Sequence, residues 1–285
     1  RVPMTPLVFL AVIAAAMLHA IWNALVKGGA DKRLNMAGVV IGHIPLALVA
    51  LVLSPSPDPA SYPYIVAGTL LHFGYQWFLL ESYKIGDLTQ VYPIARGVAP
   101  LLVAGGSVLL LGVDLSGLEL IAIGTIAAGI LSISLVRGAD GLRNGKATWM
   151  ALTTGCFIAT YSLVDGTGAR ISGSALGYYA WLGIANALIF AAFMGATTPQ
   201  VLRDLPTKGL RVFLIGGGAS FVAYSLVMWA FTQAPIALVT ALRETSIIFA
   251  LLIGVMLMGE RLSLGKVIST MITLVGVILL RFTRS

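Results

Sequence analysis

The chain has 285 residues, of which 58% are hydrophobic and only 10% are charged, and its mean hydropathy is +0.96. A water-soluble protein of this length cannot bury so many apolar side chains, so the composition indicates an integral membrane protein. The net charge of +7 is spread over short connectors and is not clustered with aromatic residues, which argues against nucleic-acid binding. The single cysteine, Cys156, excludes an intramolecular disulfide.

Ten apolar segments follow one another along the chain, each close to the ~20 residues that a membrane-spanning helix needs. They cover residues 5–27, 35–53, 62–83, 89–111, 117–136, 147–165, 175–196, 210–231, 236–258 and 264–281. Polar connectors rich in glycine or proline separate them, and none is long enough for a soluble domain. The sequence therefore predicts an all-α membrane protein with ten transmembrane helices, whose function lies inside the helix bundle or at its mouths.

The basic residues predict an orientation in the membrane. The five odd-numbered connectors contain Lys27, Lys32, Arg33, Lys84, Arg137, Arg143, Lys146, Arg203, Lys208, Arg211, Arg261 and Lys266, whereas the opposite side has only Arg1, Arg170, Arg281 and Arg284. Because Lys and Arg are enriched in cytoplasmic loops, the odd-numbered connectors are expected in the cytoplasm and both termini outside.

The two halves of the chain resemble each other faintly. At an offset of 147 residues, "LTQVYPIARGVAP" falls on "PIALVTALRETSI", so that Arg96 aligns with Arg243. Five helices per half is an odd number, so two such halves would be inserted with opposite orientations. We therefore predict two inverted five-helix repeats, residues 1–141 and 142–285, within one membrane domain.

Polar and aromatic side chains form stripes at helical spacing on several of these segments. Lipid does not tolerate such faces, so they are expected to line a shared, partly wet interior. The candidate substrate-binding residues are His19, Trp22, Asn23, His72, Tyr75, Gln76, Leu79, Tyr92, Arg96, Tyr161, Tyr224 and Arg243. His43 stands alone on an apolar segment, and packing is the interpretation we favour for it.

A cation and two prolines share the stretch "TQVYPIARGVAP". Pro93 and Pro100 each remove a helical hydrogen bond, so we expect this helix to bend and to act as a gate. Arg96 between them is either a structural cation or a substrate contact. The same alternatives hold for Arg243, whose neighbour Glu244 is another buried charge that needs a partner.

The motifs in the sequence do not indicate an enzyme. The sequence contains no metal-ligand spacing, no nucleophile elbow and no phosphate loop. "GGGAS" at residues 216–220 lacks the lysine of a nucleotide loop, and glycines in membrane helices usually permit close packing. We expect no enzymatic activity, no metal and no cofactor.

Three passages resemble the EamA-type drug/metabolite transporters over the whole chain. They are "HAIWNALVKGG", "YKIGDLTQVYPIARGVAPLL" and "LVTALRETSIIFALLIGVMLMGERLS". The last contains Gly259 and Glu260, the Gly-Glu ending typical of the family's halves, whereas the first half departs from the pattern with Gly112, Val113 and Asp114. Within this superfamily the chain is most similar to the bacterial exporters of aromatic and other neutral amino acids.

The resemblance implies a basket of helices around a central cavity, lined by the first, third, fourth, sixth, eighth and ninth spans. It implies export of amino acids or other small metabolites across the bacterial inner membrane by alternating access, with membrane lipid as surroundings and no required oligomer. Two alternatives stay open: an exchanger of phosphorylated or nucleotide-linked metabolites with the same fold, and a non-transporting membrane subunit. Proton antiport, facilitated diffusion and exchange all remain possible couplings.

Overall fold

A computed structural model of the chain describes residues 4–29, 31–85, 88–136, 145–258 and 263–282. Within these ranges every regular element is a helix, which confirms the all-α prediction. The first part contains α1 (Pro6–Gly28), α2 (Lys32–Ile41), α3 (Ile44–Leu53), η1 (Pro59–Ser61), α4 (Tyr62–Ile85), α5 (Leu88–Leu109) and α6 (Gly117–Val136). The second contains α8 (Gly145–Ile171), α9 (Ala175–Thr197), α10 (Pro199–Asp204), η2 (Val212–Gly216), α11 (Gly217–Gln233), α12 (Ile236–Arg243), α13 (Ser246–Met258) and α14 (Leu264–Phe282).

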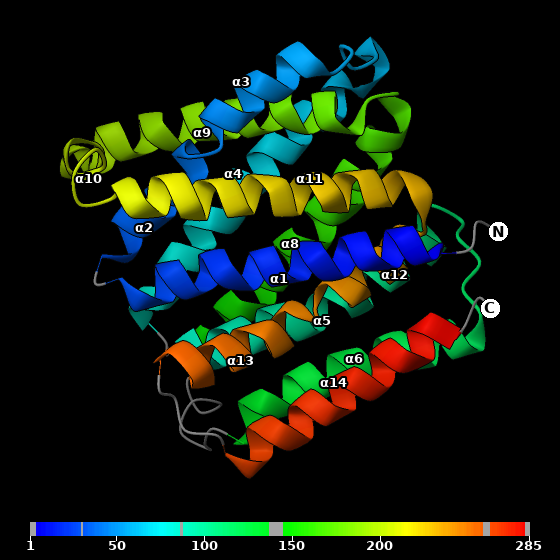
Figure 1. The fold of residues 1–285 in the computed structure, drawn as a ribbon. Coiled ribbons are helices and arrows are strands. Elements are labelled where there is room, and N and C mark those ends of the chain that lie inside the picture. Colours follow the sequence, from blue (N-terminus) through cyan, green and yellow to red (C-terminus); the bar gives the residue numbers. More distant parts are fainter. Residues whose placement is uncertain (1–3, 30, 86–87, 137–144, 259–262, 283–285) are drawn as a thin grey trace.

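The long helices lie alongside one another and alternate in direction, and the chain begins and ends at the same end of the bundle (Figure 1). α6 packs against α14 at one edge and α3 against α9 at the other. Between these edges α4 and α5 pack on α8, and α1 packs on α11 and α13. Segments far apart in the sequence therefore form the centre of the molecule together.

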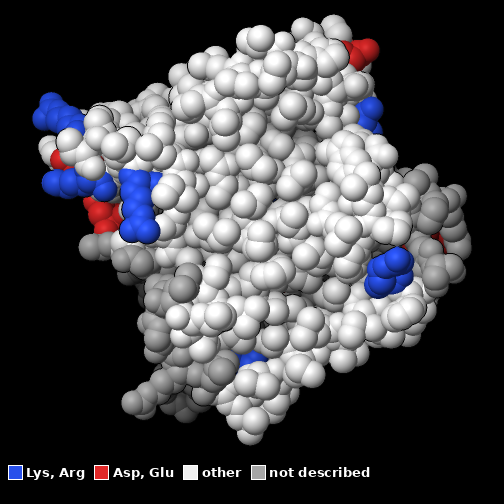
Figure 2. All heavy atoms as spheres, viewed as in Figure 1, with Lys and Arg blue, Asp and Glu red and all other residues white. Residues whose placement is uncertain are grey.

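Among the described residues, six helical stretches are long and apolar enough to cross a membrane, by length and composition. They are Pro6–Val26, Lys32–Leu53, Ala175–Thr197, Val212–Gln233, Ile236–Met256 and Leu264–Phe282. The face shown in Figure 2 is almost free of charge between the two ends of the bundle, whereas Lys and Arg gather at the end where α2 and α10 lie. These features confirm a multi-pass membrane protein, because lipid requires an uncharged belt.

Each of the ten apolar segments coincides with one helix or with two consecutive helical pieces. Segment 35–53 is divided between α2 and α3 at Gly42 and His43, just before Pro45, which cannot donate the backbone hydrogen bond of a continuous helix. Segment 236–258 is divided between α12 and α13 by tight turns at Glu244 and Thr245. These breaks expose helix ends inside the bundle, although the inverted ten-helix arrangement itself stays a prediction.

One predicted boundary was wrong. The sixth predicted segment ends at Asp165, where a glycine-rich stretch looks like a connector, but α8 continues to Ile171. A Cβ added at Gly168 would lie 2.5 Å from the Tyr178 hydroxyl oxygen. The glycine therefore permits α9 to approach α8 closely and does not mark a loop. As a consequence Asp165 is a buried residue inside the bundle.

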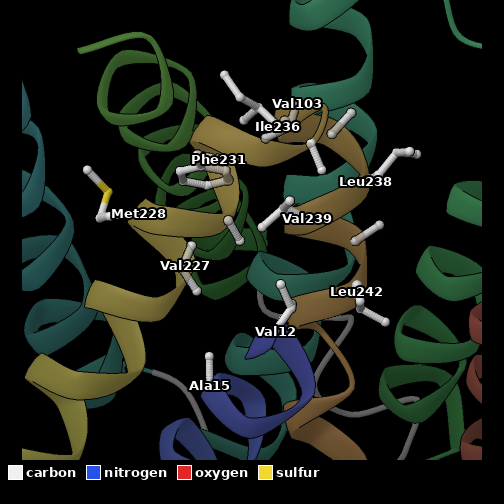
Figure 3. Close-up of a cluster of buried hydrophobic side chains, with 14 of the residues drawn as sticks. Val12, Ala15, Val103, Val227, Met228, Phe231, Ile236, Leu238, Val239 and Leu242 are labelled. Carbon is white, nitrogen blue, oxygen red and sulfur yellow. The ribbon is translucent and has the colours of Figure 1, made fainter. Parts of the chain in front are cut away.

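Tight packing holds the bundle together. In Figure 3 Val12 of α1, Val103 of α5, Phe231 of α11 and Val239 of α12 belong to one buried cluster. Apolar burial does not by itself favour contact between helices in lipid, so the close fit of these side chains supplies the attraction. Where α6 meets α14, hydroxyl groups of Ser132 and Ser269 add a hydrogen bond of 2.6 Å.

Arg170, expected in an outer connector, lies in the last turn of α8 and ties two helix ends together. Its Nε donates to the carbonyl of Phe231 at 2.7 Å, and its Nη2 donates to that of Ala234 at 2.8 Å. These carbonyls end α11 and lack helical partners.

Replacing Arg170 with alanine is therefore expected to lower stability by about 1 kcal/mol, measured by thermal unfolding in detergent. The matched variant of exposed Arg211 is expected to unfold like the wild type, and equal unfolding of both variants would contradict this role.

Candidate functional site

A cavity lies between α1, α2, α4, α8, α9, α11 and α12. Its volume is about 80 Å³. That is room for about five to eight waters at ~10–15 Å³ each. Its walls are formed by Ala15, His19, Trp22, Met36, Val39, Val40, His43, His72, Tyr75, Gln76, Tyr161, Tyr179, Leu182, Gly183, Asn186, Ser220, Ala223, Tyr224, Val227 and Arg243. The aromatic and polar residues from separate helices thus converge on one space.

Most of the candidate residues from the sequence line this cavity: His19, Trp22, His72, Tyr75, Gln76, Tyr161, Tyr224 and Arg243. Helical spacing explains this, because His19 and Trp22 on α1 lie one turn apart, as do His72 and Gln76 on α4. Trp22 Nε1 donates to His19 Nδ1 at 3.2 Å, which fixes both rings in the wall.

The other candidates lie elsewhere. Asn23 donates to the backbone carbonyl of His19 at 2.8 Å, and Leu79 is buried in a hydrophobic cluster of α2, α4 and α9. Arg96 is buried on α5 and is not among the residues that form the cavity wall. The side chain of Tyr92 lies outside the described residues. The two proposed gating residues, Pro93 and Pro100, both lie within the continuous helix α5.

Arg96 forms a buried ion pair with Glu244. Its Nε lies 2.7 Å from Glu244 Oε2, and the two side chains are 2% and 0% exposed. Arg96 Nη2 also donates to Ser246 Oγ at 3.2 Å. Two charges in such a place stabilise each other only as a pair, because either alone would remain unsolvated. The contact joins the proline-containing helix α5 to the break between α12 and α13.

Arg243 has no such carboxylate among the residues that the structure describes. It is 3% exposed and lines the cavity, and its Nε and Nη2 have no hydrogen-bond partner among the described residues. The guanidinium carbon lies 5.9 Å from the centre of the Tyr224 ring, a cation–π contact. In the predicted repeat, the offset of 147 residues that aligns Arg96 with Arg243 aligns Glu244 with Gly97. Within the described part of the chain, the second arginine therefore faces the cavity without a carboxylate in ion-pair contact.

Three further polar groups in the wall also lack partners among the described residues. They are Gln76 Oε1, Asn186 Oδ1 and His43 Nε2, and each side chain is more than nine-tenths buried. Buried polar atoms are normally hydrogen-bonded to protein or water. Their meeting at one cavity, together with Arg243, indicates a site for water or for a polar ligand.

A second buried acid lies behind the wall. Asp165 Oδ2 accepts a hydrogen bond from the Tyr224 hydroxyl at 2.7 Å and lies 2.7 Å from His72 Nε2. The His72 ring stacks on Tyr161 with centroids 4.2 Å apart. Tyr224 therefore contacts both buried charges of the site, with its ring against Arg243 and its hydroxyl on Asp165.

Sequence reasoning missed Asp165, Asn186, Tyr179 and the place of His43. His43 lies at the break between α2 and α3 and faces the cavity, with its ring edge-on to Tyr179 and Phe221. A histidine two residues before a proline inside an apolar segment was the available signal. Asn186 gave a similar signal, as a single amide within the apolar run of α9.

Comparison with known proteins agrees with this architecture. A solved structure described only as the crystal structure of a protein matches with a TM-score of 0.74 and 19% identity, covering 98% of this chain and 96% of the other, which shows a common fold. No curated protein gives a significant match. Residues 145–282 match the EamA-like transporter family. This part of the chain is thus similar to the EamA-like transporter family, the same family that the sequence motifs resemble.

Proposed function

We propose that the protein exports aromatic and other neutral amino acids across the bacterial inner membrane by alternating access. One observation carries the proposal: a buried guanidinium, that of Arg243, lines an aromatic cavity with two donor atoms unpartnered among the described residues. A planar guanidinium binds a carboxylate through two parallel hydrogen bonds. The wall around it offers amide oxygens from Gln76 and Asn186 for an ammonium group, and rings for an aromatic side chain.

The charge balance favours a carboxylate over a phosphorylated metabolite. Arg96 is neutralised by Glu244, so only the charge of Arg243 is left for an anion in the described part of the cavity. A phosphate group carries close to two negative charges at neutral pH and would leave one of them buried and uncompensated. A zwitterionic amino acid brings one carboxylate, which matches one arginine.

The packing supports two inverted repeats, residues 1–141 and 142–285, as the basis of alternating access. α8 packs on α4, and α1, at the corresponding place in the other half, packs on α11. In the same way α5 packs on α8, and α13 packs on α1. Equivalent contacts made by both halves are what a pseudo-two-fold axis in the membrane plane produces. We place the end with α2 and α10 in the cytoplasm and both chain ends outside.

Counterflow in proteoliposomes tests the function. Vesicles loaded with unlabelled phenylalanine and diluted into a trace of labelled phenylalanine, without any ion gradient, are expected to accumulate label above protein-free vesicles. Loading with inorganic phosphate is expected to give no accumulation of labelled phosphate. If labelled phenylalanine does not accumulate but labelled phosphate does, this proposal is wrong, and the protein is an exchanger of phosphorylated metabolites.

A further inference from the structure

The pair formed by His72 and Asp165 joins a fully buried carboxylate to the cavity. Asp165 is 0% exposed and does not line the cavity, whereas His72 is 12% exposed and does. Their contact of 2.7 Å joins α4 to α8. Among the described residues no Lys or Arg lies within ion-pair distance of Asp165, so His72 is its one basic partner there.

The charge of this pair depends on one proton. When imidazole Nε2–H donates to the carboxylate, a neutral His72 leaves the pair with a charge of about −1. The atom left to accept another proton is Nδ1, for which no hydrogen bond is found within the described ranges. Protonation there gives a neutral pair of imidazolium and carboxylate. One proton therefore changes the charge of the pair by one unit.

The surroundings of the pair hold several other groups that can carry charge or a proton. The elements packed around the pair carry His19 of α1, His43 at the break after α2, Tyr64 and Tyr75 of α4, Arg96 of α5, Tyr161 of α8, Tyr178 and Tyr179 of α9, Tyr224 of α11, Arg243 of α12, and Glu244 after α12. Arg96 and Glu244 cancel each other. Arg243 is then the remaining fixed charge in the described part of the wall, and it is positive.

We propose that the His72–Asp165 pair binds either one proton or the ammonium group of the substrate, so that export is coupled to proton entry. With His72 neutral, the negative pair attracts an ammonium group, while Arg243 holds the carboxylate. With His72 protonated, the pair is neutral and the cavity is positive through Arg243, which disfavours an ammonium group. This coupling rests on the proposed function, because it assumes an amino acid as the substrate.

The exchange can be followed atom by atom. In the outward-facing state a proton from the external solution binds His72 Nδ1. In the inward-facing state the arriving ammonium group displaces this proton to the cytoplasm. The amino acid then leaves to the outside, and the pair is free to take the next proton. One proton enters for each amino acid exported.

Binding of phenylalanine at several pH values tests the competition directly. The charge of phenylalanine itself stays constant between about pH 5 and 7. Competition by one proton is expected to raise its Kd by up to about tenfold per pH unit as the pH falls. Asp165→Asn is expected to bind more weakly and to lose this dependence, whereas Asp204→Asn, at the exposed Lys208 contact, keeps it. A wild-type Kd independent of pH, or an unchanged dependence in Asp165→Asn, would overturn the proposal.

Flux measurements extend the test to transport. Vesicles that contain a pH-sensitive dye are expected to report one proton moving against each phenylalanine in the wild type. The residual exchange of Asp165→Asn is expected to move none. Net phenylalanine flux down its own gradient in the wild type without proton movement would overturn the coupling and leave the proposed function in place.

If the protein does not bind phenylalanine at all, the proposed function itself is wrong. The proton site can still be tested, because the chain has three histidines and imidazole NMR signals can be assigned with single variants. The signal that disappears in His72→Gln is expected to move with pH in the wild type and to move differently in Asp165→Asn. A His72 signal that stays constant with pH would overturn the proton site.

Discussion

Replacing Arg243 with glutamine is expected to weaken phenylalanine binding about a hundredfold, which corresponds to about 2.7 kcal/mol. The change removes the one charge in the described wall that lacks a carboxylate partner, while glutamine retains some hydrogen-bonding capacity. Calorimetric titration of the detergent-purified variant measures the loss. Arg243→Lys keeps the charge but not the forked geometry, so an intermediate affinity is expected.

The same substitution should not destabilise the empty protein. Arg243 is buried with unpartnered donors, and a buried charge without partners reduces stability. Arg243→Gln is therefore expected to unfold at the same temperature as the wild type or above it. Arg211→Gln, on the exposed surface, serves as the control for charge alone. Wild-type affinity in Arg243→Gln would remove this residue from the binding site.

Replacing Glu244 with glutamine is expected to lower stability by about 3 to 5 kcal/mol, because it leaves Arg96 buried without its counter-charge. The effect is measured as the loss of apparent melting temperature in detergent. The double variant Arg96→Met with Glu244→Gln is expected to recover much of the loss, since it removes both charges together.

The double variant also separates structure from binding. If Arg96 acts as a structural cation, the recovered protein binds phenylalanine with wild-type affinity. A recovered fold with lost binding would instead make Arg96 a substrate contact, the alternative that its sequence position left open. Equal stability of Glu244→Gln and the wild type would contradict the importance of the pair.

The fold could be predicted largely because lipid imposes its own pattern. A helix in hydrocarbon needs a continuous apolar run, so α1, α9 and α14 begin and end within a few residues of the predicted segments. The end of α8 could not be predicted in this way. Its glycines serve helix contact, and glycine has the same appearance in a sequence whether it packs or turns.

The site could be predicted only in part, for a related reason. Helical spacing placed His72 and Gln76 on one face of α4, and the structure has both in the cavity wall. Spacing does not show which face meets which helix. The contact of His72 with Asp165 joins residues 93 positions apart, and the pair of Arg96 with Glu244 joins residues 148 apart. Such partners follow from three-dimensional packing and leave no local pattern.

In the predicted repeat Glu244 aligns with Gly97, so the two halves cannot replace each other. An assembly of two second halves would contain two arginines and two glutamates at its centre, each arginine with its own carboxylate, and no cation would be left for a ligand. An assembly of two first halves would contain two buried arginines facing glycines, which is electrostatically unfavourable without a bound anion. A chain that joins one half of each kind has one arginine neutralised by a carboxylate, Arg96, and one arginine that can bind a ligand, Arg243. In the predicted repeat, a difference at this single position thus separates a neutralised arginine from one that is open to a ligand.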